Sequence, residues 1–182
     1  MTSTPTRRRW LIYGGVAVVA AAAGTAGALW RYRVSGAAGE ALDPAVWALR
    51  FARPEGGELA LESFRGKPLL INFWATWCPP CVEELPMIDR FFREQASNGW
   101  QVVGLAIDQP SAVRKFLERT PVSFPNGLAG LEGTELVKKL GNTAGGLPFT
   151  LVVDAGGAVA ARKMGQLVPA DLDTWRRAQV HG

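Results

Sequence analysis

The chain has 182 residues, a length that predicts one domain of about 130–150 residues with a short appendage. Its net charge is +4, but residues 1–33 carry five arginines and no acidic residue, so the remaining chain has a net charge of −1. The folded part is therefore nearly neutral, which argues against a basic groove, and we expect no nucleic-acid partner.

The first predicted element is a transmembrane helix over residues 10–30. Residues 11–29 carry no charge, and at about 1.5 Å per residue a helix of this length spans the roughly 30 Å hydrocarbon core of a bilayer. Tryptophan and tyrosine stand at both ends of the stretch, as expected in the two headgroup regions. Three arginines precede it and two follow it, so we expect a cytoplasmic N-terminus and an exported domain.

These features divide the chain into a cytoplasmic basic tail over residues 1–9, a lipid-contacting anchor over 10–30, a linker over 31–45 and a folded domain over 46–182. A cleaved signal peptide is the alternative, because Ala26-Gly27-Ala28 suits a cleavage site and the arginines are similar to a twin-arginine signal. Either interpretation places the folded domain outside the cytoplasm.

The folded domain begins with two predicted strands, over residues 46–52 and 58–61, which form a hairpin. Residues 69–74 are a nearly continuous apolar run, typical of a central strand that is covered on both faces, and residues 101–107 repeat this pattern. The segment between these runs is predicted to be a helix, which makes the connection a right-handed crossover. Its predicted core side chains are Cys81, Leu85, Ile88 and Phe92, and its predicted solvent-facing acids are Glu83, Asp89 and Glu94.

Helices and strands continue to alternate in the second half of the domain. The predicted elements are helices over residues 112–119 (capped by Ser111), 134–140 and 171–179, and strands over residues 149–153 and 158–164. The resulting order predicts an α/β fold, with a mixed central sheet and helices on both faces.

The two cysteines, Cys78 and Cys81, stand where the first apolar strand gives way to the predicted helix. Two cysteines cannot form the disulfide framework of a small secreted domain, and with His181 as the single histidine they do not complete a four-ligand zinc site. We therefore expect neither a metal nor a cofactor. In the first turn of a helix, this spacing brings the Cβ atoms within the roughly 3.5–4.5 Å that a disulfide requires.

The helix start also assigns different chemistry to the two sulfurs. Pro79 and Pro80 suit a first turn, where N–H groups have no intrahelical acceptor. The helix dipole then favours the thiolate of Cys78, which is predicted to be exposed and to attack a substrate disulfide. Cys81 is predicted to be shielded and to resolve the mixed disulfide. The alternative is a chance pair of core cysteines.

Residues 72–81 (NFWATWCPPC), Pro86 after them and residues 146–150 (GLPFT) together resemble the TlpA/ResA-like branch of the thioredoxin superfamily. The resemblance covers about residues 46–180. It implies a thioredoxin-like fold with an N-terminal β-hairpin and a single N-terminal transmembrane helix. It also implies a single-pass protein of the bacterial inner membrane, with its catalytic domain in the periplasm.

The resemblance implies roles for several residues. Cys78 and Cys81 would be the catalytic thiols of a redox-active disulfide, with Pro79 and Pro80 between them. Pro148 would form a cis peptide bond facing the dithiol and, with the Leu147 backbone, would bind the substrate chain as an added strand. Trp77 would shape the surface beside Cys78, although a tryptophan packed at the domain boundary is the alternative.

At three further positions the residue in this chain can be compared with the residue that related proteins have there. Asn72 stands where cytosolic thioredoxin has a buried proton-carrying acid, and an asparagine cannot titrate. Glu84 matches a glutamate that some ResA-like proteins place near the dithiol, with a solvated helix carboxylate as the alternative. Phe149 replaces a polar residue beside the cis-proline, which favours apolar substrate surfaces.

The family implies a thiol–disulfide oxidoreductase that reduces disulfides in exported apoproteins, during cytochrome c maturation or copper oxidase assembly, and that a membrane electron donor re-reduces. Pro79-Pro80 lacks the histidine found between the cysteines of strong oxidants, so the predicted potential is nearer about −270 mV than about −120 mV. The alternatives are a dithiol oxidase or isomerase of exported proteins, and a copper-handling chaperone with soft cysteine ligands.

Overall fold

The computed structural model describes residues 39–179. The predicted transmembrane segment over residues 10–30 and His181 lie outside this range. Within it, no helix is both long enough and apolar enough to cross a bilayer.

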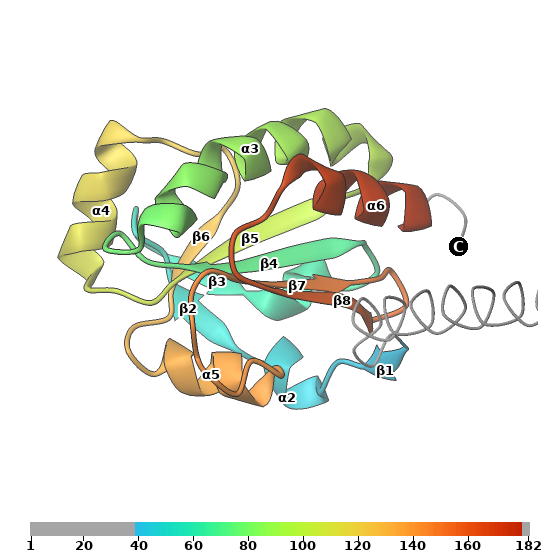
Figure 1. Ribbon diagram of the computed structural model, residues 1–182. Helices are drawn as coiled ribbons and strands as arrows, with labels where there is room; N and C mark the ends of the chain where they lie inside the picture. Colours follow the sequence, from blue (N-terminus) through green and yellow to red (C-terminus); the bar gives the residue numbers. More distant parts are fainter. Residues whose placement is uncertain (1–38, 180–182) are drawn as a thin grey trace, which may run out of the picture. The chain divides into compact units, whose positions relative to one another are not determined.

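An eight-stranded mixed sheet forms the centre of the domain (Figure 1), with the strand order β1-β8-β7-β4-β5-β6-β2-β3. The central strand β4 runs parallel to β5 and antiparallel to β7, and β5 runs parallel to β6. The remaining neighbours are antiparallel. The strands are β1 (Glu40–Ala41), β2 (Arg50–Ala52), β3 (Glu58–Ala60), β4 (Leu69–Trp74), β5 (Gln101–Ala106), β6 (Asn126–Leu128), β7 (Phe149–Val153) and β8 (Ala158–Met164).

Helices cover both faces of this sheet, as Figure 1 shows. On one face lie α3 (Pro79–Gln95), α4 (Pro110–Arg119) and α6 (Pro169–Gln179), and on the other lie α2 (Pro44–Trp47) and α5 (Gly133–Lys139). Short 3₁₀ turns occur at Leu61–Phe64 and Ala96–Asn98. The structure thus confirms the predicted thioredoxin-like α/β architecture.

Strand β4 illustrates how the sequence divides the core. All six of its side chains are buried, because both faces of the sheet are covered. Leu69, Ile71 and Phe73 pack on the α2–α5 side. Leu70 and Trp74 pack on the α3 side, and Asn72, which alternates with them, is the polar residue of that face.

The start of the domain differs from the prediction. Residues 46 and 47 belong to α2 and not to a strand, because Asp43 caps a helical turn through the Ala45 N–H at 2.8 Å and Pro44 is suited to its first position. Only Arg50–Ala52 pairs with Glu58–Ala60. The strands β1 and β6 were not predicted, and β1 and the start of α2 lie inside the segment 31–45 that was predicted to be a linker.

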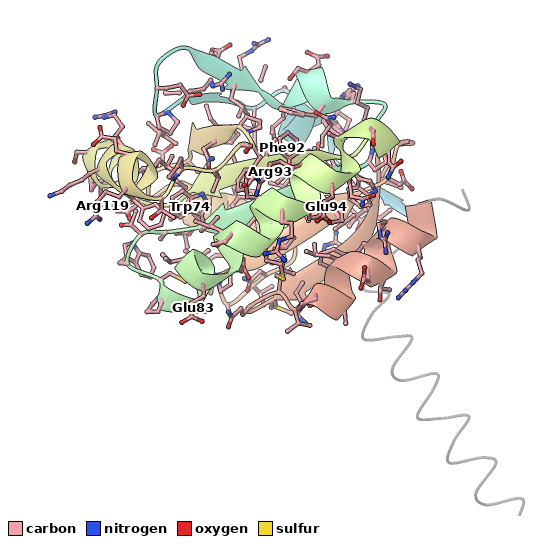
Figure 2. All side chains as sticks on the ribbon, turned by 90° about the horizontal axis from the view of Figure 1, so that it is seen from above. Trp74, Glu83, Phe92, Arg93, Glu94 and Arg119 are labelled. Carbon is pink, nitrogen blue, oxygen red and sulfur yellow. A yellow bond between two sulfur atoms is a disulfide. The ribbon has the colours of Figure 1, made fainter. Side chains whose placement is uncertain are left out.

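Figure 2 looks down on the helical layer, with α3 between α4 and α6. Glu83 and Glu94 are exposed, as predicted. The prediction for Asp89 is wrong, since this side chain is buried and accepts a hydrogen bond from the Ser123 N–H. The chain that leads from α4 to β6 covers it. Helix α4 also begins at Pro110 instead of being capped by Ser111.

Candidate redox site

The two cysteines lie at the junction between β4 and α3. Cys78 is the N-cap residue of α3 in an extended conformation (φ −102°, ψ 100°), and its N–H donates to the Ala75 carbonyl at 3.2 Å. Pro79 and Pro80 occupy the first turn, where a proline removes no helical hydrogen bond. This geometry is the one that the sequence predicted for the segment.

Cys78 and Cys81 are joined by a disulfide, with an S–S distance of 2.08 Å and a Cα–Cα distance of 5.3 Å. Cys81 is completely buried, whereas Cys78 is 4% exposed. The order of accessibility agrees with the predicted roles, but in the disulfide-bonded state Cys78 is more enclosed than we expected. Of the two sulfur-bearing residues, only Cys78 therefore has any surface that solvent contacts.

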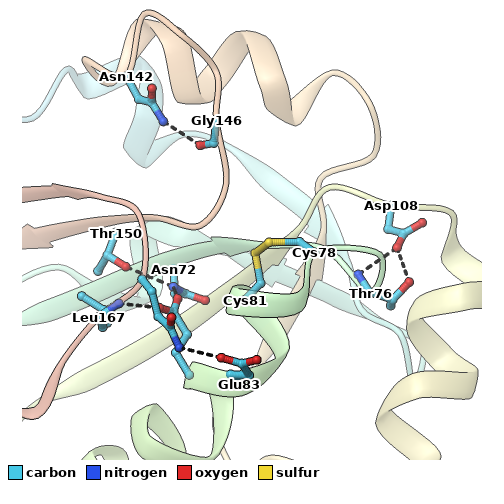
Figure 3. Close-up of a disulfide and its surroundings, with 12 residues drawn as sticks. Asn72, Thr76, Cys78, Cys81, Glu83, Asp108, Asn142, Gly146, Thr150 and Leu167 are labelled. Carbon is cyan, nitrogen blue, oxygen red and sulfur yellow. Dashed lines mark hydrogen bonds between the residues drawn. A yellow bond between two sulfur atoms is a disulfide. The ribbon is translucent and has the colours of Figure 1, made fainter.

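A buried carboxylate fixes the loop that precedes Cys78. Asp108, two residues after β5, accepts hydrogen bonds from the Thr76 N–H at 3.0 Å and from the Thr76 hydroxyl (Figure 3). Its other oxygen accepts from the Gln109 N–H at 2.7 Å. Asp108 was not among the predicted site residues, although an acid two residues after an apolar strand parallel to β4 lies at the same end of the sheet as the cysteines.

Replacing Asp108 with alanine is expected to lower the free energy of unfolding by about 2–3 kcal/mol, because three donors lose a charged acceptor. Urea denaturation of the oxidised protein would measure this. Thr76→Ser is the matched control, since it keeps the hydroxyl and is expected to stay within about 0.5 kcal/mol of the original chain. Equal stability of both variants would show that this clamp contributes nothing.

The loop before β7 lies next to the cysteine loop. The pairing of Phe73 with Phe149 puts the preceding residues beside the carboxyl end of β4, and Leu147 packs against the core cluster that contains both cysteines. The Leu147–Pro148 peptide bond is cis, as the family resemblance implied. The Pro148 carbonyl accepts from the Gly165 N–H at 2.9 Å.

Another buried polar side chain, that of Asn142, holds the loop that precedes Pro148. The Asn142 amide nitrogen donates to the Gly146 carbonyl at 2.7 Å (Figure 3), and Asn142 is 2% exposed. The loop before Cys78 is therefore held by Asp108 from the end of β5, and the loop before Pro148 is held by Asn142 from within that loop. Nothing in the local sequence around Asn142 indicated this contact.

The expected influence of Phe149 on substrate choice is wrong. Phe149 is fully buried and stacks on Phe73, with 5.8 Å between ring centroids. Alternation along β7 turns this ring into the core on the α5 side, away from the dithiol face. The next residue, Thr150, faces the dithiol side instead.

A polar network lies beneath the dithiol. The amide nitrogen of Asn72 donates to Glu84 Oε1 at 2.7 Å and to Thr150 Oγ1 at 3.0 Å. Glu84 Oε2 accepts from the Leu167 N–H at 2.7 Å. Glu84 is 1% exposed, so it is not the solvated carboxylate of the alternative interpretation.

Burial raises the pKa of Glu84, because an ionised carboxylate loses its hydration in this position. The Leu167 and Asn72 donors oppose the rise in pKa, and the charge of Asp171 adds to it slightly. Because Glu84 lies one helical turn after Cys81 on α3, a carboxylate with a raised pKa stands close to the more deeply buried sulfur.

Exposed apolar side chains gather at the edge of the sheet where the dithiol lies. Among residues 39–179, four large hydrophobic side chains are exposed, and all follow or end strands at this edge. Trp77 follows β4 and is 64% exposed, so it is a surface residue and not one packed at a boundary. The other three are Leu131 after β6, Met164 at the end of β8, and Val168.

Comparison with known proteins agrees with this geometry. The Redoxin family model matches residues 37–175. The thiol-disulfide oxidoreductase ResA of Bacillus thuringiensis subsp. konkukian is 29% identical over 122 residues, which are 66% of this chain and 68% of ResA.

Solved structures show the same likeness. A thiol:disulfide interchange protein from Chlorobium tepidum superimposes with a TM-score of 0.67 and 26% identity, over 80% of this chain and 99% of that one. StoA from Bacillus subtilis superimposes with a TM-score of 0.59 and 25% identity, over 73% and 99%. The chain therefore belongs to the Redoxin family, and it is a thiol–disulfide oxidoreductase with a thioredoxin-like fold.

Proposed function

We propose that this protein is a disulfide reductase for exported polypeptides, in which Cys78 attacks the substrate and Cys81 resolves the intermediate. The observation that carries this proposal is the Cys78–Cys81 disulfide at the first turn of α3, beside the cis Leu147–Pro148 bond. Exchange with a polypeptide needs both features. The disulfide supplies the reacting sulfurs, and the backbone next to Pro148 supplies hydrogen-bonding groups for the substrate chain.

In the first step the Cys78 thiolate attacks one sulfur of a substrate disulfide. A mixed disulfide forms, the substrate bond breaks, and the second substrate sulfur leaves as a thiolate that takes a proton from water. The positive end of the α3 dipole stabilises the Cys78 thiolate. The backbone of Leu147 binds the substrate chain by main-chain hydrogen bonds, as an added strand beside Pro148.

In the second step Cys81 loses its proton and attacks Cys78. The protein disulfide forms and the substrate sulfur leaves as a thiolate that takes a proton from water, so that over both steps the substrate has gained two electrons and two protons. Glu84 is the proton acceptor for Cys81, since its raised pKa makes it a stronger base than an exposed carboxylate. Asn72 cannot take this proton, because an amide does not titrate in this range.

Exposed apolar side chains support a polypeptide as the substrate. A small disulfide would need only Cys78, whereas Trp77, Met164 and Val168 are exposed apolar side chains that follow or end strands at the end of the sheet where the dithiol lies. Unfolded polypeptides expose apolar side chains, and burying them against this edge favours binding. We assign the clients to exported apoproteins of cytochrome c maturation or copper oxidase assembly.

Reduction requires a low potential, which the Pro79-Pro80 pair favours because it adds no charge or donor beside Cys78. We expect a potential nearer about −270 mV than about −120 mV, measured by equilibration with glutathione buffers. The variant Pro80→His is the matched control and is expected to raise the potential. A potential above roughly −150 mV in the original chain would rule out the reductase assignment and favour an oxidase.

The proposed location is the outer side of a bacterial inner membrane. In this proposal residues 1–9 stay in the cytoplasm, residues 10–30 anchor the chain in lipid, and the folded domain, whose first strand is β1 (Glu40–Ala41), reaches a membrane electron donor in the periplasm. Protease added to spheroplasts is expected to remove the domain while a cytoplasmic control protein survives. Protection of the domain would contradict the proposed topology.

A further inference from the structure

The side-chain amide of Asn72 has two ends with different surroundings. Its nitrogen donates to two acceptors, Glu84 Oε1 and Thr150 Oγ1, which determines the orientation of the amide. Asn72 is completely buried, yet its oxygen Oδ1 has no hydrogen-bond partner. In the part of the chain that the structure describes, it is the one buried side-chain polar atom in this condition.

The unpaired oxygen lies on the Cys81 side of the amide. Leu70 and Trp74, which flank Asn72 on the same face of β4, pack in the core cluster that contains Cys81. Cys81 also stands one helical turn before Glu84, the partner of the Asn72 nitrogen. Figure 3 shows the Asn72 oxygen turned toward Cys81, with Thr150 on the opposite side.

The redox state of Cys81 decides whether this oxygen has a donor. In the disulfide the Cys81 sulfur carries no proton, so it cannot donate. Reduction adds two electrons, breaks the S–S bond and adds a proton from water to the Cys81 sulfur, while Cys78 becomes a thiolate or takes up a second proton from water. A thiol is a weak donor, but a buried acceptor that otherwise has no partner gains from it.

We propose that Asn72 Oδ1 accepts a hydrogen bond from the Cys81 thiol in the reduced protein. Asn72 then stabilises the dithiol relative to the disulfide, in which the same oxygen is left unpaired. It also holds the Cys81 proton until the mixed disulfide forms and Glu84 removes that proton. The inference rests on the proposed function only in taking Cys81 as the resolving thiol.

Infrared spectroscopy of the S–H stretch tests the hydrogen bond directly. The chain has two cysteines, so the reduced variant Cys78→Ala has a single thiol and a single S–H band. We expect this band at a lower wavenumber than in the urea-unfolded variant, and a return toward the unfolded position in Cys78→Ala/Asn72→Leu. Adding Thr150→Val instead is the control, which removes a neighbour of the amide and is expected to leave the band unchanged.

The proposal is wrong if the S–H band of folded Cys78→Ala has the same wavenumber as that of the urea-unfolded variant. This outcome does not depend on whether the Asn72→Leu chain folds. A crystal structure of the reduced protein with a water molecule on Asn72 Oδ1 and no contact to Cys81 would overturn it as well.

The redox equilibrium provides a second, independent measurement. Against glutathione, Asn72→Leu is expected to shift the equilibrium toward the disulfide by about five- to tenfold, because one buried hydrogen bond of the reduced state is lost. The shift is expected to persist in a Glu84→Gln background, which excludes an effect through the carboxylate charge.

If Asn72→Leu still exchanges with glutathione but its equilibrium constant is unchanged, the inference about Asn72 is wrong while the proposed function stands. A wild-type chain that does not exchange its disulfide at all would instead contradict the proposed function.

Discussion

Replacing Cys81 with serine is expected to convert the protein from a catalyst into a covalent trap. Cys78 can still attack a substrate disulfide, but no second thiol is present to release the product, so mixed disulfides accumulate on Cys78. Turnover in a disulfide-reduction assay should fall by more than about a thousandfold, because each molecule reacts only once. Non-reducing electrophoresis of the exported fraction, followed by mass spectrometry, would identify the trapped proteins.

The matched control is Cys78→Ser, which leaves Cys81 completely enclosed. This variant is expected to lose turnover equally and to trap nothing, because a substrate does not reach the Cys81 sulfur. Adducts on Cys81 in this control would reverse the assignment of the two sulfurs. If Cys81→Ser folds but traps nothing, the proposed exchange mechanism is wrong.

Replacing Glu84 with glutamine is expected to slow substrate release by about a hundredfold, because the Cys81 thiol loses its proton acceptor. In the original chain the rate should rise with pH through the raised pKa of Glu84, as the carboxylate becomes ionised. In Glu84→Gln this step of the pH profile should disappear. Stopped-flow measurement of mixed-disulfide resolution between about pH 4 and pH 9 would separate this step from the initial attack.

The neighbouring glutamate provides the control for this experiment. Glu83 lies on the same helix but is exposed, and its carboxylate accepts a hydrogen bond from Gln166 at 3.1 Å. Glu83→Gln therefore makes the same chemical change outside the buried network, and its pH profile is expected to match that of the original chain. A pH profile of Glu84→Gln that keeps the same step would show that Glu84 is not the acceptor.

The contribution of Glu84 to the free energy of unfolding should fall as pH rises. An ion-paired carboxylate, whose pKa is lowered by folding, would show the opposite dependence. Because the pKa of Glu84 is higher in the folded than in the unfolded chain, its favourable contribution is complete below the unfolded pKa and is lost as pH rises through the folded pKa. Leu167, Asn72 and Lys163 favour the charged form and Asp171 opposes it, and burial outweighs them together. Glu84→Gln should thus gain stability relative to the original chain as pH rises.

The sequence alone predicted the elements whose pattern is strong and local. Residues 69–74 and 149–153 are largely apolar runs and residues 158–164 follow a recognisable turn, and the structure confirms all three as strands. The position of Cys78 and Cys81 at the start of a helix also followed from local chemistry, because a strand end and two prolines leave few other conformations. The short strands β1 and β6 could not be predicted, since their backbone pairs only with distant segments.

Only the tertiary structure decided the surroundings of the dithiol. From its helical spacing, Glu84 could have been either solvated or buried. It is buried because the segment after β8 covers it, and Leu167, 83 residues away, donates a hydrogen bond to its carboxylate. Thr150, 78 residues from Asn72, takes the second hydrogen of its amide. Such contacts depend on which strands become neighbours in the sheet, which no local pattern encodes. The sequence therefore predicted where the two cysteines of the disulfide lie, whereas the fold determined which polar groups surround them.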